Sequence, residues 1–577
     1  MTDRLDGRLL VGEVEMVVVE RWQRALRVAR GDEPADLILR GGRVVNVLTL
    51  EIEDASVAIA DGRIIGVGDY DQAVEVIELD GAYVAPSFID GHIHTESSLL
   101  WVTEFARAVV PHGTGAIVTD PHEIVNVAGL PGFDSMVDAS RDLPLGVFLT
   151  VPSCVPASPR ETAGAEMTAE SIAQGMGSRA SVALGEMMNF PGVLAGDPDI
   201  FAKISAADGY RRDGHAPGLT GRTLDAYVLS GMTSDHESTT LEEGRDKLRR
   251  GMMLMIREGS STHNMEALLP LVDDRTWPRC CFASDDRDCA MLLHRGHMDE
   301  TLRMAVAHGL EPLRAIRMVT FNTADYWRLD GYGAIAPGYW ANLVVLDDLR
   351  DFRVRQVYFQ GRRVANDGTI EVEVKPAIPE VLRNTVHLPN LGPADLRLDP
   401  MTARQAVGAI DGEIVTRRLD VEPTVRDGEA VADTDKDLLK LVSVERHRGT
   451  GNVGVGYVHG FGLKRGALAS SIAHDAHNII AVGCNDSDIL SAIREVALSQ
   501  GGLAAVVNGE VLAHLPLPVA GILSDLPLED AAARYELLEQ TARDLGSTLH
   551  SPFGLLAFMA LSVIPEARVT DQGFVVV

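Results

Sequence analysis

The chain has 577 residues, of which 46% are hydrophobic, so it is long and apolar enough for several packed domains and is not a disordered polypeptide. Its 52 basic and 83 acidic residues leave a formal net charge of −31, which excludes a general nucleic-acid-binding surface because phosphate contacts need clustered lysine and arginine. The five cysteines show no CxxC spacing, and the sequence has neither a signal peptide nor the roughly 18-residue apolar run of a membrane span, so we expect free thiols and a soluble, cytoplasmic protein.

Residues 36–85 and 331–374 share one pattern of alternating apolar and polar residues, which follows an N-terminal helical segment. Apolar and basic residues at helical spacing predict an N-terminal helical segment over residues 1–35. From Asp36 to Val84, apolar and polar residues alternate and are broken by Gly-Gly and Asp-Gly, which is typical of antiparallel strands joined by tight turns. A similar pattern returns in Tyr332–Asp367. We therefore predict one composite β domain, built from residues 36–85 and 331–374, with another domain inserted into it.

The inserted segment, residues 86–330, alternates apolar runs with helical stretches, the pattern of parallel strands and crossover helices. Eight apolar runs are present, the weakest of them at Tyr210–Gly218. Eight βα units predict an α/β fold with a closed (β/α)8 barrel. In such a barrel the chemistry lies at the C-terminal ends of the strands, so the polar residues that end each run are the candidates for a site.

Histidine and carboxylate side chains end most of these runs. They are His92 and His94 after the first run, Asp120 after the second, Glu186 after the fourth, His215 after the fifth, His236 after the sixth and Asp285 after the eighth. Side chains alternate along a strand, so His92 and His94 project from the same face. Each residue alone has a structural alternative, such as a turn carboxylate, a solvated imidazole or a helix-capping acid. The complete order is less probable by chance and predicts a site for one or two divalent metal ions.

The turn TDPHEIV, Thr119–Val125, allows two interpretations. Asp120, Pro121 and Glu123 fit the first positions of a helix, where a carboxylate capping box would explain them without any chemistry. Alternatively, the turn points both carboxylates and His122 at the barrel mouth, where paired acids can transfer protons.

These residues resemble the amidohydrolase superfamily and, within it, the bacterial-type adenine deaminases, from about Asp36 to the end of the chain. The motifs that carry the resemblance are IDGHIHTESSLL (Ile89–Leu100), VTDPHEIVNVAG (Val118–Gly129), GEMMNFPGV (Gly185–Val193), DGHAPGLTG (Asp213–Gly221), SDHEST (Ser234–Thr239), SDDR (Ser284–Arg287) and IAHDAHNIIAVG (Ile472–Gly483).

The resemblance implies a binuclear metal centre, with manganese or iron ahead of zinc. Its ligands would be His92, His94, Glu186, His215, His236 and Asp285, with Asp285 a better match than Asp286. Many superfamily members carry a carboxylated bridging lysine on strand 4, where this chain has Glu186, and a protein carboxylate can bridge in its place. Family members commonly associate, so we also expect a homo-oligomer.

The implied activity is hydrolysis of adenine to hypoxanthine and ammonia, a reaction of purine salvage and adenine catabolism. Metal-activated hydroxide would attack C6 of the base, with Asp285 as general base and with Glu123 or Asp120 protonating a ring nitrogen and the leaving amine. Two alternatives remain open. One is hydrolysis of a cyclic amide or N-acyl bond by the same type of site, and the other is a non-catalytic barrel scaffold.

Residues 375–577 predict a separate C-terminal α+β domain. Within it, an apolar run is interrupted by the polar residues of HDAHN, including His474, Asp475 and His477. They are either satisfied polar side chains of a surface loop or, as the resemblance implies, part of a segment that approaches the barrel mouth. We expect them, together with His122, to help cover the substrate.

Overall fold

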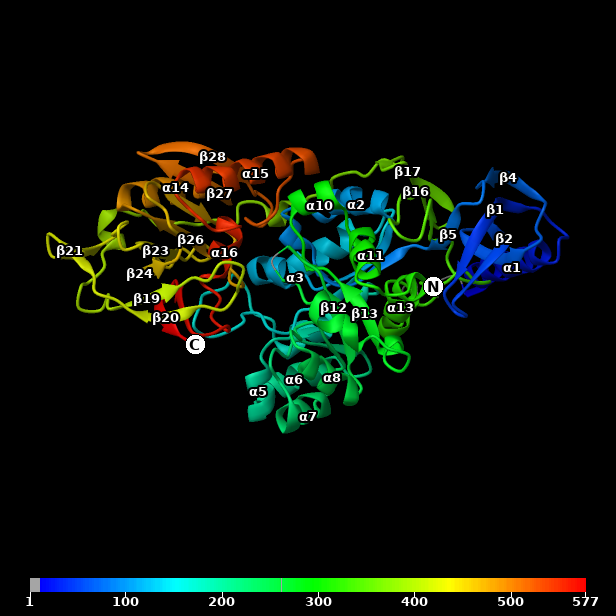
Figure 1. Cartoon of the computed structure of the whole chain (residues 1–577), viewed down its shortest axis with the longest axis horizontal. Coiled ribbons are helices and arrows are strands. Elements are labelled where there is room, and N and C mark those ends of the chain that lie inside the picture. The colour runs from blue at the N-terminus through cyan, green and yellow to red at the C-terminus, as the bar shows by residue number, and fades with distance from the viewer. Residues whose placement is uncertain (1–10, 261) are drawn as a thin grey trace. The chain divides into compact units, whose positions relative to one another are not determined.

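The computed structural model describes residues 11–260 and 262–577, so residues 1–10 of the predicted N-terminal segment lie outside the described part. The chain divides into two compact units (Figure 1). The first unit comprises Met1–Asp90, Val109–Ala116 and His297–Glu373, and the second comprises Gly91–Ala108, Ile117–Gly296 and Val374–Val577. All five cysteines are free, as predicted.

The first unit contains a nine-stranded sheet made from both flanks of the inserted segment. Its order is β18-β17-β16-β15-β5-β1-β2-β3, with β4 paired to β1. The strands are β1 (Ala35–Asn46), β2 (Glu51–Ala60), β3 (Arg63–Gly68), β4 (Ala73–Glu78), β5 (Tyr83–Pro86), β15 (Leu343–Leu346), β16 (Val354–Phe359), β17 (Arg362–Asn366) and β18 (Thr369–Ile370). The flanks join where β5 pairs with β15, with Val84 opposite Val345, and both residues are fully buried.

Among its described residues, this unit has the α-helices α1 (Val11–Ala29), α11 (Met298–Ala307), α12 (Pro312–Met318) and α13 (Phe321–Trp327). The buried side chain of Val28 packs with Ile38, Ala58 and Ile65, so α1 covers part of the sheet. Burial of these apolar side chains is the main force that holds a helix to a sheet.

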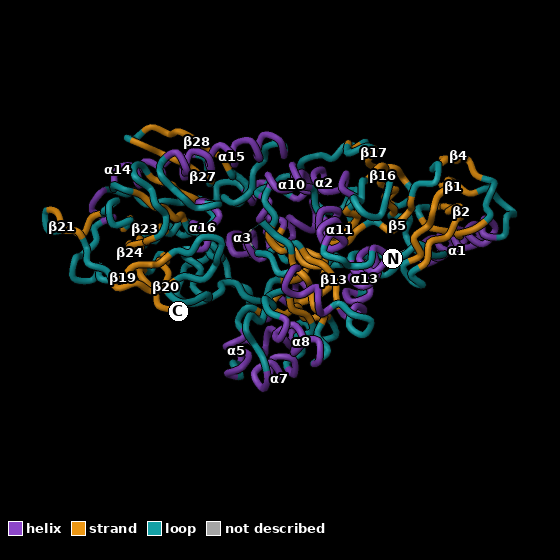
Figure 2. The backbone as a smooth tube through the Cα atoms, in the orientation of Figure 1, coloured by secondary structure: helices purple, strands orange, loops and turns teal. Residues whose placement is uncertain are grey.

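The inserted segment forms two further sheets (Figure 2). One is six-stranded, in the order β10-β9-β8-β7-β6-β14, and the other is three-stranded, in the order β11-β12-β13. The strands are β6 (Phe88–His94), β7 (Thr114–Thr119), β8 (Gly146–Val151), β9 (Ser181–Met187), β10 (Arg211–Gly214), β11 (Ser234–Asp235), β12 (Met253–Arg257), β13 (Cys280–Ala283) and β14 (Asp285–Asp286). Each of the eight apolar runs contains a strand, and the eighth run contains both β13 and β14.

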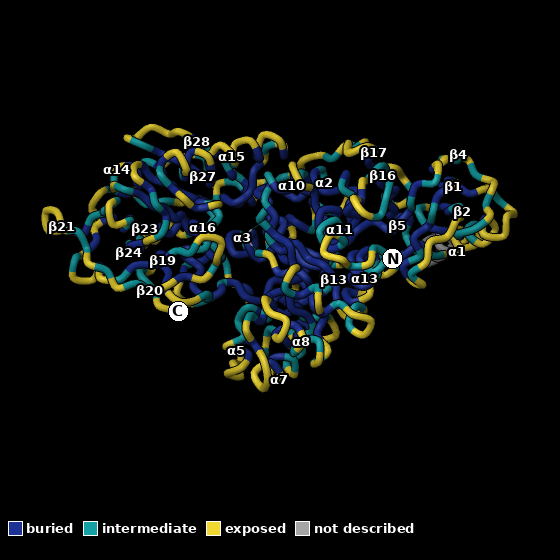
Figure 3. The backbone as a smooth tube through the Cα atoms, viewed as in Figure 1, coloured by how far each residue is buried: buried dark blue, intermediate teal, exposed yellow. Residues whose placement is uncertain are grey.

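Helices follow these strands along the chain. They are α2 (Val102–Val109), α3 (His122–Ala139), α4 (Ala169–Met176), α5 (Phe190–Ala195), α6 (Pro198–Ala206), α7 (Gly221–Leu229), α8 (Leu241–Arg249), α9 (Met265–Leu268) and α10 (Cys289–Arg295). The pairs β8–β9, β9–β10, β11–β12, β12–β13 and β14–β6 are parallel. Every residue of β6, β7, β12 and β13 is buried, as expected for parallel strands covered on both faces (Figure 3).

The C-terminal part of the second unit is built on an eight-stranded sheet in the order β20-β19-β24-β23-β26-β25-β27-β28. Its strands are β19 (Gln405–Gly408), β20 (Arg417–Asp420), β23 (Leu438–Val444), β24 (Val453–His459), β25 (Ala467–Ser470), β26 (Ile479–Gly483), β27 (Gly502–Val507) and β28 (Glu510–Pro516). The helices are α14 (Asp486–Leu498), α15 (Leu528–Asp544) and α16 (Pro552–Phe558), and two small hairpins are β21 (Thr424–Arg426) with β22 (Glu429–Val431) and β29 (Ala567–Thr570) with β30 (Gly573–Val576). Apolar residues of α14, including Ile489 and Ile493, pack on Val442 and Ile479 of the sheet, and the HDAHN segment connects β25 to β26.

Among the helices of the described residues, none combines the length and the apolar character that crossing a membrane requires.

Candidate active site

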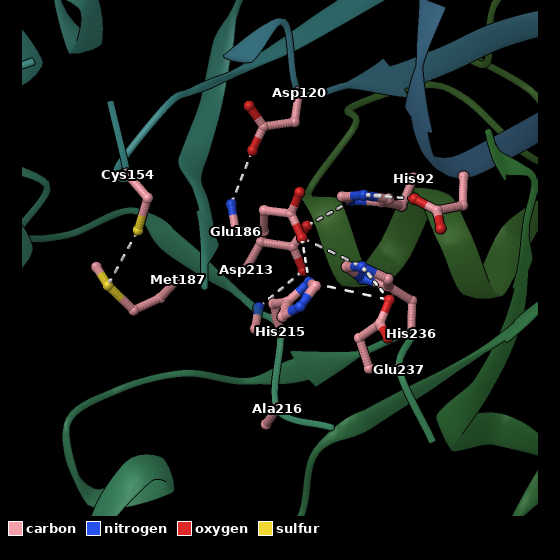
Figure 4. A network of polar contacts seen from close by, with 12 residues as sticks. His92, Asp120, Cys154, Glu186, Met187, Asp213, His215, Ala216, His236 and Glu237 are labelled. Atoms are coloured by element: carbon pink, nitrogen blue, oxygen red, sulfur yellow. Dashed lines mark hydrogen bonds and ion pairs between the residues drawn. The ribbon is translucent and has the colours of Figure 1, made fainter. Parts of the chain in front are cut away.

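The six predicted metal ligands lie together at the C-terminal ends of strands in the second unit. Figure 4 shows His92, Glu186, His215 and His236 among them. His92 and His94 end β6, Glu186 lies in β9, and Asp285 lies in β14. His215 follows β10 directly, and His236 follows β11. Five of the six side chains are buried and that of His215 is partly exposed.

The hydrogen bonds of the Nδ1 atoms show which ring nitrogen of His92 and His94 carries the proton. Nδ1 of His92 lies 2.8 Å from a carboxylate oxygen of Asp213, and Nδ1 of His94 lies 2.9 Å from the backbone carbonyl oxygen of Asp120. A carbonyl or carboxylate oxygen can only accept, so each Nδ1 donates. In the neutral imidazoles that a metal ligand requires, both Nε2 atoms therefore carry lone pairs, although they lie only 3.2 Å apart. Two lone pairs that face each other fit a shared cation, and the Nδ1 contacts are those of metal-ligating histidines.

The carboxylate of Glu186 lies between His94 on one side and His215 with His236 on the other. Its Oε1 lies 3.3 Å from Nε2 of His94, whereas its Oε2 lies 2.7 Å from Nδ1 of His215 and 3.2 Å from Nε2 of His236. Burial favours the neutral acid, but His215, His236 and His94 hold the pKa of Glu186 well below its ordinary value. An ionised carboxylate with one oxygen toward each group is the arrangement that a bridging ligand needs.

Asp285 completes the group. Its Oδ1 lies 3.2 Å from Nε2 of His94, and its Oδ2 accepts a hydrogen bond from the buried Arg257 at 2.6 Å. Burial opposes ionisation, but Arg257 and the neighbouring histidines hold the pKa of Asp285 well below its ordinary value. Asp286 instead accepts a hydrogen bond from the hydroxyl of Ser97. The contacts thus favour Asp285 over Asp286 at this position.

Three residues of the site were missed in the sequence: Asp213, Glu237 and Arg257. Asp213 orients His92, and Arg257 lies between Glu237 and Asp285 and contacts both carboxylates. Asp213 stands two positions before His215 and Glu237 directly follows His236, so proximity to a predicted ligand was the available signal. Nothing in the sequence around Arg257 marks it.

A second histidine–carboxylate group, which we call the Glu123 cluster, consists of Glu123, His474 and His477. His474 Nδ1 lies 2.5 Å from Oε1 of Glu123, and His477 Nε2 contacts Oε2 of the same carboxylate. Nδ1 of His477 accepts the backbone N–H of Ala473 at 3.3 Å, so the proton of a neutral His477 is on Nε2 and points at Glu123. Both imidazoles therefore aim at one carboxylate.

The charges in the Glu123 cluster follow from these contacts. Burial raises the pKa of Glu123, but His474, His477 and His122 outweigh it and hold that pKa well below its ordinary value. Burial lowers the pKa of His474, but Glu123 outweighs it and raises that pKa to about 9. At neutral pH the cluster thus contains an ionised Glu123 and a protonated His474.

The other predicted residues border the two groups. His122 lies 3.3 Å from Glu123 and 3.5 Å from Glu186, and Asp475 lies 4.0 Å from His122. Burial raises the pKa of Asp475 to about 6. Asp120 accepts the backbone N–H of Glu186 at 2.8 Å, and the side chain of Asp120 does not cap α3. The capping-box interpretation of this turn is therefore not found.

A cavity of about 550 Å³, which we call the metal pocket, opens over these residues. His122, Glu123, His474 and Asp475 line it together with five of the six predicted ligands, whereas Asp120 and His477 do not. Its apolar lining comes mainly from the C-terminal part of the chain and consists of Ile414, Phe558, Leu561, Val563 and Ile564, with Met188 from the inserted segment.

Comparisons with known proteins cover most of the chain. Residues 83–364 match the amidohydrolase family, and residues 413–577 match the adenine deaminase C-terminal domain. A protein named adenine deaminase from Dehalococcoides mccartyi is 50% identical over 551 residues, which are 95% of this chain and 96% of that protein. Proteins of the same name from Oleidesulfovibrio alaskensis and Kosmotoga olearia are 46% and 40% identical, each over 95% of this chain and 96% of their own length.

Proposed function

The chain belongs to the adenine deaminases of the amidohydrolase family, and we infer from this membership that it hydrolyses adenine to hypoxanthine and ammonia. The observation that carries the conclusion is 50% identity over nearly the whole chain, including the C-terminal domain that the family model describes. This domain separates adenine deamination from hydrolysis of a cyclic amide or N-acyl bond and from a non-catalytic scaffold.

We propose that the protein holds two divalent ions. His92, His94 and Asp285 would bind one, His215 and His236 the other, and Glu186 would bridge them. The facing lone pairs of His92 and His94 and the two-sided contacts of Glu186 support this assignment. When bound, such ions lower the pKa of water and supply hydroxide near neutral pH. Nitrogen and oxygen ligands accept manganese, iron and zinc alike, and the resemblance ranks manganese and iron first.

We propose that Asp285 and Glu123 move the protons of the reaction. Asp285 would accept the proton of the attacking water through Oδ1, while Arg257 holds Oδ2. Glu123 lines the metal pocket and contacts protonated His474, so this pair would deliver a proton to the ring nitrogen and the leaving amine. Asp120, which bonds to the backbone of Glu186, would act by holding that bridging residue.

We propose that the strands β6 to β14 close into one (β/α)8 barrel over residues 86–330. The eighth strand supports this, because β13 pairs with β12 and β14 pairs with β6. A backbone hydrogen bond of 3.2 Å from Thr233 to Arg212 supports closure between β10 and β11. The remaining proposed divisions are the helical segment 1–35, the composite β domain 36–85 plus 331–374 and the C-terminal domain 375–577.

The direct test is to purify the protein with manganese, supply adenine and measure ammonia. A panel of adenosine, guanine and dihydroorotate tests the substrate class, and reconstitution of the metal-free protein with manganese, iron or zinc tests the metal. Ammonia from adenine alone is expected, and turnover of dihydroorotate in preference to adenine would support the cyclic-amide alternative.

We further propose a cytoplasmic homo-oligomer that binds neither nucleic acid nor membrane, which light scattering and co-sedimentation can check.

A further inference from the structure

A second cavity, the outer cavity, lies next to the metal pocket in the second unit. It has a volume of about 860 Å³, compared with about 550 Å³ for the metal pocket. Glu123, Asp286, His474 and Phe558 line both cavities, so these four side chains form the boundary between them. The metal centre itself does not use the larger space.

The boundary contains a stacked pair of rings. The imidazole of His474 lies on the ring of Phe558, with centroids 4.6 Å apart and planes 8° from parallel. Glu123 contacts Nδ1 of His474, at the edge of the imidazole ring. A molecule in the outer cavity and a molecule in the metal pocket would therefore both contact this pair.

The outer cavity has apolar walls. They include the side chains of Leu99, Ile472, Leu503, Ile522 and Phe553. Such walls bind a flat, weakly hydrated ring system, because transfer of apolar surface out of water is favourable and aromatic rings stack on one another.

The acidic side chains that line the outer cavity disfavour a phosphorylated ligand. Four carboxylates, Glu96, Glu123, Asp286 and Asp288, line the outer cavity, and Arg287 donates to the carbonyl oxygen of Gly296 at 2.9 Å. A phosphate would be repelled by the carboxylates. Asp286 accepts a hydrogen bond from Ser97 through Oδ1, and its carboxylate suits a ligand that presents N–H groups.

We propose that the outer cavity binds a neutral purine base at a position separate from the metal centre. The identity of the base rests on the proposed function, because adenine and hypoxanthine are the flat, neutral N–H donors that this site handles. A base in the outer cavity lies against the His474–Phe558 pair, directly beside the metal pocket. The cavity thus holds adenine before it reaches the metal centre or hypoxanthine after it leaves.

The stoichiometry of purine binding tests the proposal. Hypoxanthine is the probe, because it is the product and is not turned over, and equilibrium dialysis against the manganese-loaded protein counts the bound molecules. We expect two per chain in the wild type. Leu503→Trp places a larger side chain in the outer cavity, and this variant is expected to bind one hypoxanthine per chain. Leu561 lines only the metal pocket, so Leu561→Trp is expected to retain the hypoxanthine of the outer cavity.

Kinetics and matched controls complete the test. Leu503→Trp is expected to lower kcat/KM for adenine by about tenfold or more while the manganese content stays at the wild-type level. Leu498→Trp makes the same change at a side chain that is 80% exposed and is expected to alter neither value. Ile522→Phe is a smaller substitution in the same cavity and replaces Leu503→Trp if that variant does not fold.

One hypoxanthine per chain in the wild type would overturn the proposal, as would unchanged stoichiometry and kinetics in both outer-cavity variants. The outcome is distinguishable from failure of the proposed function. A protein that deaminates adenine but binds one purine lacks the outer site, whereas a protein that binds two purines but releases no ammonia has the site without the activity.

Discussion

The metal centre and the Glu123 cluster are both buried groups of histidine and carboxylate, yet their protons are arranged in opposite ways. In the metal centre, the Nδ1 protons of His92 and His94 point outward to Asp213 and Asp120, so the Nε2 lone pairs face inward. In the Glu123 cluster, both imidazoles point N–H groups at one carboxylate. With neutral imidazoles, as metal ligands require, the first group presents lone pairs and two carboxylates that suit a cation, whereas the second neutralises itself. The contacts of the outer ring nitrogens, more than the residue types, support the proposal that the first group binds metal and the second does not.

The largest expected effect comes from Asp285. Asp285→Asn keeps a hydrogen-bonding side chain but removes the base, so turnover of adenine should fall by about 10²- to 10⁴-fold while most of the metal stays bound. Steady-state kinetics and metal analysis of the purified variant check this. Full activity would contradict the assignment of Asp285 as the base.

Glu123→Gln tests directly whether the Glu123 cluster holds protons while the metal centre holds metal. It removes the charge that stabilises protonated His474, so kcat should fall by about 10²-fold. The metal content should stay at the wild-type level, because the Glu123 cluster is proposed to hold protons and no metal. Glu166→Gln makes the same change at an exposed residue and is the control. A loss of metal together with the loss of activity in Glu123→Gln would contradict the proposal that the Glu123 cluster holds no metal.

Lys247→Met should weaken the metal centre without touching its ligands. The fully buried ammonium group of Lys247 lies 2.7 Å from the carbonyl oxygen of Ala216 and 2.8 Å from the carboxylate of Asp235, the residues next to His215 and His236. Without this positioning residue, metal affinity should fall by about 10- to 100-fold, as measured by competition with a chelator. Lys464→Met changes an exposed lysine and should leave the affinity unchanged.

His477→Ala should have a smaller effect than Glu123→Gln. His474 and His122 remain to hold the ionised Glu123, so only one of its three histidine contacts is lost, and kcat for adenine should fall by about tenfold. Kinetics of this variant and of His474→Ala check the prediction. Unchanged kinetic constants in both would remove the C-terminal segment from the site.

The smallest effect concerns the anchoring of the C-terminal segment. His447 Nε2 donates to the carbonyl oxygen of Ala476 at 2.6 Å, and burial holds the pKa of His447 well below its ordinary value. The unfolded chain binds a proton near pH 6.5 that the folded chain does not, so stability is lost as the pH falls below that value, by at most about 1.4 kcal/mol per pH unit. Denaturant unfolding between pH 7.5 and 5.5 should show a shallower loss in His447→Gln. An equal slope in both proteins would contradict this role of His447.

Much of the metal centre could be predicted because its signals are local. The alternation of a strand places His92 and His94 on one face, and apolar runs that end in histidine or carboxylate mark the strand ends. Asp120 shows the limit of such patterns. Its position fits a helix cap, but the side chain accepts the N–H of Glu186, 66 residues later in the chain. The pattern of a capping box is local, whereas the partner that Asp120 uses is brought to it by the pairing of strands.

By itself, the sequence of this protein determined the strand order of the ligand-type residues and the family, because both are written in short motifs. The tertiary structure alone decided which nitrogen of each histidine carries the proton, because that depends on the acceptor beside it. It also brought His477 to Glu123 across 354 residues and placed Arg257 between two carboxylates. Contacts of this kind have no periodicity along the chain, so they exist only once segments distant in the sequence have packed together.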